Sequence, residues 1–266
     1  MKIRVISAII MAIILVPVLL IGNTLFDIVM IILAMGSLQE LFNMRSHFKP
    51  VPFAVRMIGF ILLFLFIISG SNQNSLLFSF EYKYVVAFLL TLLLPIVIYR
   101  NKETYTIEDA AYALTSVLLL GVVFNLIIAL RDIRLAYIIY LLIVSISVDS
   151  FGILAGSLIG KHKLAPDISP KKTMEGAVYG FLMSTILASS FFMIIIDNNA
   201  DLLLVIIMSA ALSISAIIGD LFFSAIKRHY REKDFSNLIP GHGGILDRID
   251  SLIFVILIFI LFGTIL

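Results

Sequence analysis

The sequence predicts an all-α, polytopic integral membrane protein. Of its 266 residues 61% are hydrophobic and only 14% are charged, and its mean hydropathy is +1.14. These values lie far outside the range of soluble domains. The hydrophobic residues come in runs of roughly 17 to 25, which is enough for a helix to cross a bilayer. A segment surrounded by lipid must satisfy its own backbone hydrogen bonds, so we expect these runs to be helices.

Nine hydrophobic runs are predicted to be transmembrane helices. They lie at residues 5–22, 27–44, 53–70, 84–99, 109–129, 135–156, 174–196, 202–220 and 251–266. The first run resembles a signal peptide, but it is long and no small-residue cleavage site follows it, so we expect a retained helix. We predict a single membrane domain, 1–266, with an N-terminal helical scaffold (1–134) and a C-terminal catalytic half (135–266).

Lysine and arginine residues set the predicted orientation, because cytoplasmic loops carry an excess of them. With the N-terminus in the cytoplasm, 16 of the 19 cations lie inside, and only Lys83, Arg131 and Arg134 lie outside. This orientation supports a multi-pass protein of the cell's inner (plasma) membrane with its active site facing the cytoplasm. The absence of cysteine excludes disulfides and thiolate metal sites. A net charge of +2 says little about partners, and no nucleic-acid partner is predicted.

Polar residues gather in two segments of the last third, roughly 157–173 and 221–250. If the preceding helix continues into the second segment, one face of it carries Asp220, Ser224, Lys227, Arg228 and Arg231. A carboxylate at membrane depth is costly and usually faces a polar cavity, which makes Asp220 a candidate functional residue. The alternative is that Asp220 only pairs with Lys227 or Arg228 while the cations extend to the membrane interface.

The stretch PGHGGILDRID, residues 240–250, combines glycines with acids. Its glycines suit a tight loop whose backbone can approach a ligand closely. Asp247 and Asp250 are three residues apart at a helix start, so both can face one site. With Asp220 they would offer hard oxygen ligands, which favours Mg²⁺. As an alternative, such glycines and acids also occur as ordinary turns and as partners of a helix dipole.

These residues closely resemble the signature of the phosphatidate cytidylyltransferases, also called CDP-diacylglycerol synthases. The pattern is carried by Ser224, Lys227, Arg228, Lys233, Asp234, Pro240 to Gly244, Asp247, Arg248 and Asp250. The resemblance extends upstream through Gly219-Asp220, SPKKTMEG (169–176) and DSFGILAGSLIGKHKLAP (149–166). The first hundred residues agree only in hydropathy and length. The sequence departs from the family at Phe223, where an acidic residue is common, and at Met174, where an aromatic is frequent.

The resemblance implies transfer of a cytidylyl group from CTP to phosphatidate in the bilayer, giving CDP-diacylglycerol and pyrophosphate for phospholipid synthesis. Mg²⁺ is the implied cofactor, with a second metal or a monovalent cation left open. We expect catalytic roles for Asp220, Lys227, Arg228, His242 and Asp247, and metal binding by Asp220, Asp247 and Asp250. We expect substrate binding by Ser169, Lys171, Lys172, Thr173, Glu175, Ser224, Gly243, Gly244, Arg248 and Asp149. His242 could bind phosphate, orient Asp247 or cap the loop.

The segment DISPKKTMEG is predicted to open the helix at 174–196. Ser169 is a good N-cap and Pro170 a good first helical residue, which would place Lys171 and Lys172 in the first turn. Cations there oppose the helix dipole unless an anion, such as a phosphate of CTP or phosphatidate, lies between them. The alternative is that they only flank the membrane on its positive side.

Gly152, Gly156 and Gly160 recur every four residues in and just after the expected helix 135–156. Such spacing predicts close helix packing, within the chain or in a homodimer. Asp149, on the same stripe, could bind the metal or nucleotide or pair with a neighbouring helix. Glu40 is a weaker candidate of the same kind, and exposure at the membrane interface would account for it.

Two other functions compete with this interpretation. A cytidylyltransferase or kinase acting on another membrane lipid, such as an ether-lipid or polyprenyl phosphate, would have the same core site. A secondary transporter would also have many helices and buried acids, with its substrate between related repeats near the midplane. The transporter is disfavoured because the polar residues gather on the cytoplasmic side and no repeat is visible.

Overall fold

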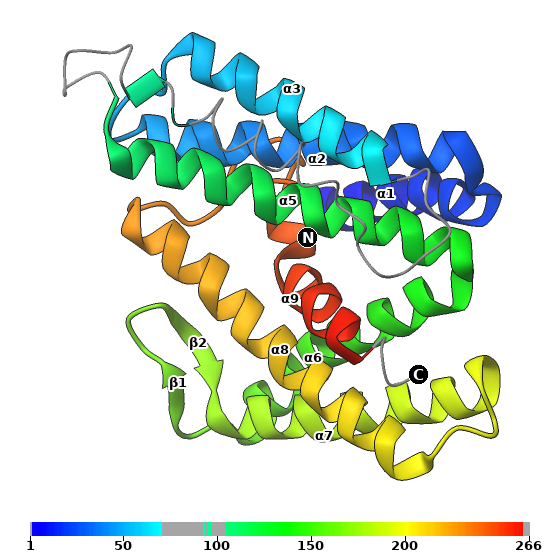
Figure 1. The fold of residues 1–266 in the computed structure, drawn as a ribbon. Coiled ribbons are helices and arrows are strands. Elements are labelled where there is room, and N and C mark those ends of the chain that lie inside the picture. The colour runs from blue at the N-terminus through cyan, green and yellow to red at the C-terminus, as the bar shows by residue number, and fades with distance from the viewer. Residues whose placement is uncertain (1, 71–92, 94, 97–104, 263–266) are drawn as a thin grey trace. The chain divides into compact units, whose positions relative to one another are not determined.

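The computed structural model of the chain describes residues 2–70, 93, 95–96 and 105–262 (Figure 1). They divide between two compact units, Met1–Asp132 with Asp234–Asp247, and Ile133–Lys233 with Arg248–Leu266. The predicted all-α membrane fold is confirmed, because the described regular structure is helical apart from one small two-stranded sheet. Among these residues, five helices are long and apolar enough to cross a membrane, and two more apolar helices are shorter. The span expected at 84–99 lies almost wholly outside the described residues, so the total of nine stays a prediction.

The described part of the first unit consists of four helices and a loop. Its helices are α1 (Lys2–Ile21), α2 (Asn23–Ser46), α3 (Phe53–Gly70) and α5 (Ile107–Ile133). The loop is 234–247, and its last two residues begin the helix α9 (Leu246–Phe262). Glycine lets aromatic rings pack closely between these helices: a Cβ at Gly59 would lie 2.9 Å from the Phe42 ring. The Phe42 ring also meets Phe60 edge-on, with the ring centroids 6.1 Å apart. The core of this unit is therefore hydrophobic and tightly packed.

A buried carboxylate ties α2 and its C-terminal end to the start of α5. Asp109 is 6% exposed and accepts hydrogen bonds from Arg45 at 2.5 Å and from Lys49 at 2.7 Å. The backbone N–H of Thr106 also donates to Asp109, at 2.9 Å. Removing one partner of a buried ion pair leaves the other charge uncompensated, so these contacts fix how the two helices meet.

Two arginines that the predicted orientation leaves outside the cell cap helix ends. In the first unit, Arg131 donates to the carbonyl oxygens of Leu19 and Leu20 at the end of α1, at 2.8 and 3.0 Å. In the second unit, Arg134 donates to Ile195 and Ile196, at 2.8 and 2.7 Å. The last carbonyls of a helix have no partner within it, so each arginine satisfies groups that would otherwise be unpaired.

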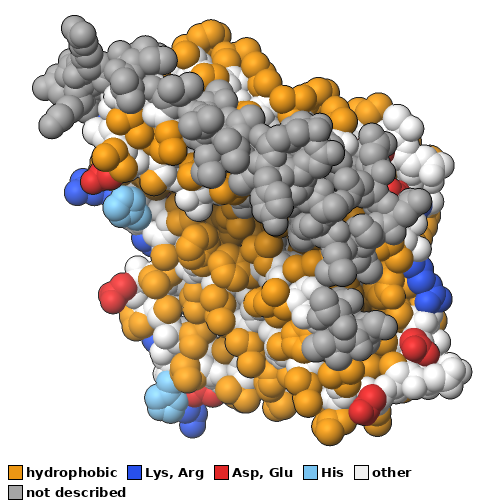
Figure 2. All heavy atoms as spheres, viewed as in Figure 1, with side chains coloured by type: hydrophobic (Ala, Val, Ile, Leu, Met, Phe, Trp, Pro, Cys, Tyr) orange, Lys and Arg blue, Asp and Glu red, His pale blue; other side chains and the backbone are white. Residues whose placement is uncertain are grey.

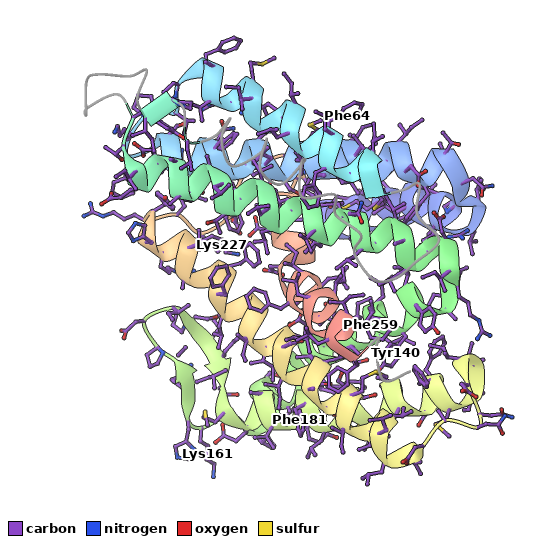
Figure 3. All side chains as sticks on the ribbon, viewed as in Figure 1. Phe64, Tyr140, Lys161, Phe181, Lys227 and Phe259 are labelled. Atoms are coloured by element: carbon purple, nitrogen blue, oxygen red, sulfur yellow. The ribbon has the colours of Figure 1, made fainter. Side chains whose placement is uncertain are left out.

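The second unit contains five helical segments and the sheet. These are α6 (Leu135–Ile159), β1 (Lys163–Ala165), β2 (Ser169–Thr173), α7 (Met174–Phe191), the π-helix η1 (Phe192–Ile196), α8 (Leu202–His229) and α9 (Leu246–Phe262). The first two residues of α9, Leu246 and Asp247, belong to the first unit. In the core of the second unit the ring of Tyr140 packs against those of Phe192 and Phe259 (Figure 3). Its hydroxyl lies 2.8 Å from that of Ser209.

The glycine stripe of α6 packs against α7. A Cβ at Gly176 would lie 2.6 Å from the carbonyl oxygen of Gly152, and one at Gly180 would lie 2.6 Å from that of Val148. Gly156 faces Gly176 as well. The predicted packing role of the stripe is confirmed, and its partner is a helix of the same chain.

Among the described residues, hydrophobic side chains predominate on the face seen in Figure 2. Among the most exposed are Ile153, Leu158 and Ile194, at 74%, 74% and 76% of their full accessible surface. A soluble protein rarely leaves such side chains exposed in large numbers, whereas lipid is a favourable surrounding for them.

The predicted start of α7 is wrong. Ser169 and Pro170 begin β2, which pairs antiparallel with β1, and α7 starts at Met174. Thr173 is the N-cap, and its hydroxyl accepts the backbone N–H of Gly176 at 3.2 Å. The strand keeps two lysines out of the first helical turn, where they would oppose the dipole, and Glu175 occupies that turn instead.

The helix α8 continues beyond Asp220 to His229, but Arg231 does not extend its face. Arg231 has a left-handed backbone, φ 59°, just beyond the helix end. The backbone N–H of Arg231 donates to Arg228 at 2.9 Å, and that of Glu232 to Lys227 at 2.8 Å. This pair of bonds is a Schellman motif, which ends the helix. The expectation that Arg231 shares a helical face with Asp220 is therefore wrong.

Candidate functional site

Three carboxylates from three helices lie near one another in the second unit. They are Asp149 on α6, Asp220 on α8 and Asp250 on α9, and each of the other two is repelled by the charge of Asp220. Asp250 is buried, with 9% of its surface exposed. Like charges in a partly apolar site repel strongly, so their proximity requires nearby cations.

Two lysines supply that compensation. Lys172 on β2 forms an ion pair with Asp220. The Nζ of Lys227 on α8 lies 3.9 Å from a carboxylate oxygen of Asp250, and Lys227 is only 7% exposed (Figure 3). Arg248, at the start of α9, also attracts Asp149. The structure thus brings six predicted residues of this unit into one polar cluster, namely Asp149, Lys172, Asp220, Lys227, Arg248 and Asp250.

Hydroxyl groups extend this polar cluster between the helices. Ser224 donates to Asp220 at 3.3 Å, one helical turn along α8. Ser251 donates to Asp149 at 3.3 Å, and its oxygen lies 3.0 Å from that of Ser145. Ser251 is not among the residues predicted from the sequence. Its position directly after Asp250, at the start of an apolar run, is the signal that could have found it.

The β1–β2 hairpin carries several predicted binding residues and is braced by two others. Arg228 donates to the carbonyl oxygen of Ile168 at 3.2 Å. The carboxylate of Glu175 accepts the backbone N–H groups of Lys161 and His162, at 3.1 and 3.2 Å, and lies 2.7 Å from the His162 ring. Arg228 and Glu175 therefore hold the hairpin in place.

Neighbouring residues of β2 lie in different surroundings. Lys171 is exposed whereas Lys172 is half-buried beside Asp220. Ser169 begins the strand and is half-buried, and Thr173 ends it as the buried cap of α7. Of this segment, Lys172 alone joins the polar cluster through a described ion pair.

The remaining predicted residues lie in the loop 234–247 of the first unit. Gly241 and Gly243 have positive φ angles of 77° and 82°, so the predicted tight glycine turn is present. Asp247 closes the loop: its Oδ2 accepts the backbone N–H groups of Phe235 and Gly244, at 2.8 and 2.9 Å. A Cβ at Gly243 would lie 2.7 Å from that carboxylate, which explains why the loop needs glycine there.

His242 lies in this loop, with its Nδ1 2.7 Å from the hydroxyl of Ser7 on α1. A histidine nitrogen engaged in this way fixes the ring orientation and leaves Nε2 to face other groups. The contact favours a role for His242 in anchoring the loop, and the other two roles stay predictions.

Glu40 is not exposed at the interface as expected. Only 4% of its surface is accessible. Its Oε1 accepts the Ser236 hydroxyl at 2.7 Å and the Ile245 N–H at 2.8 Å, and its Oε2 accepts the Leu246 N–H at 2.9 Å. The signal available in the sequence was a lone carboxylate near the end of an apolar helix, which is costly unless it has partners.

Among the described residues, no three Asp, Glu or His side chains converge closely enough to hold a metal ion by themselves. Magnesium commonly uses only one or two carboxylates and completes its octahedron with water and substrate phosphates. Asp220 and Asp250 fit that requirement, since each is a carboxylate beside a lysine that substrate phosphates could also engage. Asp247 fits less well because its Oδ2 already accepts two backbone N–H groups.

Comparison of the sequence with known proteins shows the family of this chain. A profile described as "Cytidylyltransferase family" matches residues 2–266. Proteins named phosphatidate cytidylyltransferase from Staphylococcus saprophyticus, Staphylococcus haemolyticus and Staphylococcus aureus (strain COL) are 37%, 36% and 35% identical to the chain. Each comparison extends over 257 residues, 96% of this chain and 96% of the relative. The chain, with its cluster of acids and lysines between membrane helices, therefore belongs to the cytidylyltransferase family.

Proposed function

We propose that this chain transfers the cytidylyl group of CTP to phosphatidate, releasing CDP-diacylglycerol and pyrophosphate. The observation that carries the proposal is the cluster in which Lys172 and Lys227 accompany the carboxylates of Asp149, Asp220 and Asp250. Relatives bearing the name phosphatidate cytidylyltransferase match the chain over nearly their whole length, which supports the same substrates here.

The reaction brings two anions together, so the protein must screen charge and align the reacting groups. A phosphate oxygen of phosphatidate attacks the α-phosphorus of CTP. A new P–O bond forms as the bond to the β-phosphate oxygen breaks, and pyrophosphate leaves with that electron pair. A phosphate monoester is already nucleophilic near neutral pH, so the site needs no strong general base.

The lysines of the cluster suit this task. Lys227 is 7% exposed, and a charge removed from water acts more strongly on a nearby anion than a solvated one. Lys172 is paired with Asp220, which fixes its position before a substrate arrives. Ser224, one turn from Asp220, steadies the same carboxylate. These residues would meet substrate phosphates, and Arg248 supplies a further positive charge near Asp149.

We propose Mg²⁺ as the cofactor, held by Asp220 and Asp250. When bound, the ion would supply positive charge to the phosphate oxygens of CTP as the transition state forms. Asp149 lies close enough to Asp220 to interact with it electrostatically and is the available carboxylate for a second cation. Asp247 uses its Oδ2 to support the loop of the first unit, and its expected metal-binding role stays a prediction.

The proposed location is the cytoplasmic face of the plasma membrane, where CTP is found. The charge distribution supports it, because both polar segments carry the cations assigned to the inside. The glycine stripe of α6 already packs against α7 of the same chain. The proposal therefore does not need a homodimer to explain these glycines.

Purified protein in detergent, supplied with Mg²⁺ and CTP carrying a radioactive α-phosphate, tests the proposal. One set of reactions contains phosphatidate and the other an ether-lipid phosphate, and the lipid phase is extracted and counted. We expect label in the lipid phase with phosphatidate. Label in the lipid phase only with the ether lipid would show that the substrate is an ether-lipid phosphate. No label with either lipid would reject the enzyme assignment.

A further inference from the structure

We propose that Glu40 is a positioning residue of the site, whose carboxylate fixes the conformation of the loop 234–247 and the first residues of α9. The inference rests on the proposed function and adds a residue from α2, far from the signature in sequence. Glu40, the loop and the first two residues of α9 all belong to the first unit.

The contact of Glu40 with the loop is made of three hydrogen bonds to one buried carboxylate. The Ser236 hydroxyl and the Ile245 N–H share Oε1, and the Leu246 N–H donates to Oε2. Hydrogen bonds to an ionised group are shorter and stronger than neutral ones. A carboxylate that is 4% exposed needs such partners, because an unpaired buried charge is highly unfavourable.

Two glycines make room for the contact, one on each side of it. Gly36 lies one turn before Glu40 on the same face of α2, and a Cβ there would collide with the Cδ1 of Ile245. Gly244 lies on the loop side, and a Cβ there would collide with the carboxylate of Glu40. The helix and the loop are thus complementary in shape as well as in hydrogen bonding.

Glu40 and Asp247 together accept four backbone N–H groups of the loop, three of them from consecutive residues. Asp247 takes the N–H groups of Phe235 and Gly244, and Glu40 takes those of Ile245 and Leu246. These amides are therefore committed to the protein's own carboxylates. The glycines shape the loop, and because residues 234–247 contain no lysine or arginine, positive charge for substrate phosphates must come from side chains outside it.

The hydrogen bond from the Leu246 N–H to Glu40 also fixes where α9 begins. The helix starts at Leu246, whose N–H is held by Glu40. A start displaced by one residue would turn the following side chains by about 100° around the helix axis. Arg248 and Asp250 follow directly, so their direction depends on this start. Glu40 thereby acts through the helix and needs no contact with a substrate.

The test compares the variants Glu40→Gln and Ser236→Ala with the control Glu108→Gln, an exposed glutamate of the same unit. Glutamine keeps the size but offers one acceptor oxygen, and its amide group would face an N–H donor. Three readouts are needed: the thermal unfolding midpoint, kcat and KM for CTP transfer to phosphatidate, and hydrogen–deuterium exchange of the peptide that contains Ile245 and Leu246.

For Glu40→Gln we expect faster exchange at Ile245 and Leu246 and a kcat lowered by about tenfold or more, with KM for CTP within about threefold. The unfolding midpoint should stay within about 5 °C of the unmodified protein. Ser236→Ala, which keeps both backbone bonds, should lower kcat by about twofold to fivefold. Glu108→Gln should change none of the three readouts.

Unchanged hydrogen–deuterium exchange in Glu40→Gln would contradict the claim that Glu40 holds the loop. Faster exchange with a normal kcat would mean that Glu40 is only a structural residue. If Glu40→Gln does not fold, Ser236→Ala decides: a lowered kcat with an unchanged midpoint supports the proposal, and a normal kcat overturns it. An inactive unmodified protein would instead reject the proposed function, while the exchange measurement would still report whether Glu40 holds the loop.

Discussion

Lys172 on β2 and Asp220 on α8 form an ion pair in the second unit, and the neighbouring Lys171 is exposed. Both lysines were expected in one helical turn, where they would act together. The strand separates them, because successive side chains of a strand point to opposite faces. The consequence is that the two lysines should differ in importance.

Lys172→Gln should lower turnover by about a hundredfold, the loss of roughly 2.7 kcal/mol of charge stabilisation in the transition state. Lys171→Gln should have a clearly smaller effect. The measurement is the initial rate of CTP incorporation into lipid at saturating substrates. Lys163→Gln, an exposed position on β1, is the control and should leave the rate unchanged. Equal losses for Lys171 and Lys172 would contradict the assignment of Lys172 alone to the polar cluster.

Asp220→Asn and Asp247→Asn should separate catalytic charge from loop support. For Asp220→Asn we expect a normal yield of monodisperse protein and a turnover lowered by about a hundredfold or more, since the half-exposed Lys172 can be solvated. Asp247→Asn should in addition lower the unfolding midpoint, because a neutral amide accepts the two backbone N–H groups less strongly, a cost of about 1–2 kcal/mol.

The paired measurement is detergent-extracted yield with Mg²⁺-dependent turnover. Low yield of Asp220→Asn with normal specific activity would mean that Asp220 is only a structural partner of lysine. Full stability of Asp247→Asn would show that the loop does not depend on that carboxylate.

The α6–α7 contact predicts different tolerances at two glycines that face each other. Gly176→Ala would place a Cβ 2.6 Å from the Gly152 carbonyl oxygen, whereas Gly152→Ala would place one 3.5 Å from that of Gly176. Overpacking against backbone costs about 1–3 kcal/mol, so Gly176→Ala should lower the unfolding midpoint by several degrees. Gly152→Ala is the matched control and should unfold near the unmodified protein. The reverse order would contradict the described packing.

The sequence was sufficient for the membrane fold and for the charged residues of the polar cluster, but not for the Ser251 hydroxyl beside Asp149. Long hydrophobic runs leave few alternatives to helices, and the acids and lysines of the last third stand out against them. The start of α7 could not be predicted from the neighbouring residues alone, because Ser169 and Thr173 are both acceptable N-caps. Only the pairing of β2 with β1 (Lys163–Ala165) decides between them. Glu40 was only a weak candidate and its burial was not expected, because its partners, Ile245 and Leu246, lie some 200 positions away.

The absence of cysteine allows the predicted topology to be tested with single cysteines. Ala165→Cys, at the end of β1, and Leu238→Cys, in the loop 234–247, should react with a membrane-impermeant thiol reagent only after the cells are opened. Asn199→Cys, an exposed position between η1 and α8, should react in intact cells. This outcome follows from the positive-inside distribution of Lys and Arg. Labelling of Ala165→Cys or Leu238→Cys from outside would contradict a cytoplasmic site.

The central claim, cytidylyl transfer, is tested most directly by following which phosphate of CTP reaches the lipid. Parallel reactions contain phosphatidate, Mg²⁺ and CTP labelled in either the α- or the γ-phosphate, with Asp220→Asn as the inactive comparison. Attack at the α-phosphorus predicts that the α-label enters the lipid phase, that the γ-label stays in water as pyrophosphate, and that the two products form in equal amounts. Entry of the γ-label into the lipid phase without the α-label would show a lipid kinase and contradict the account.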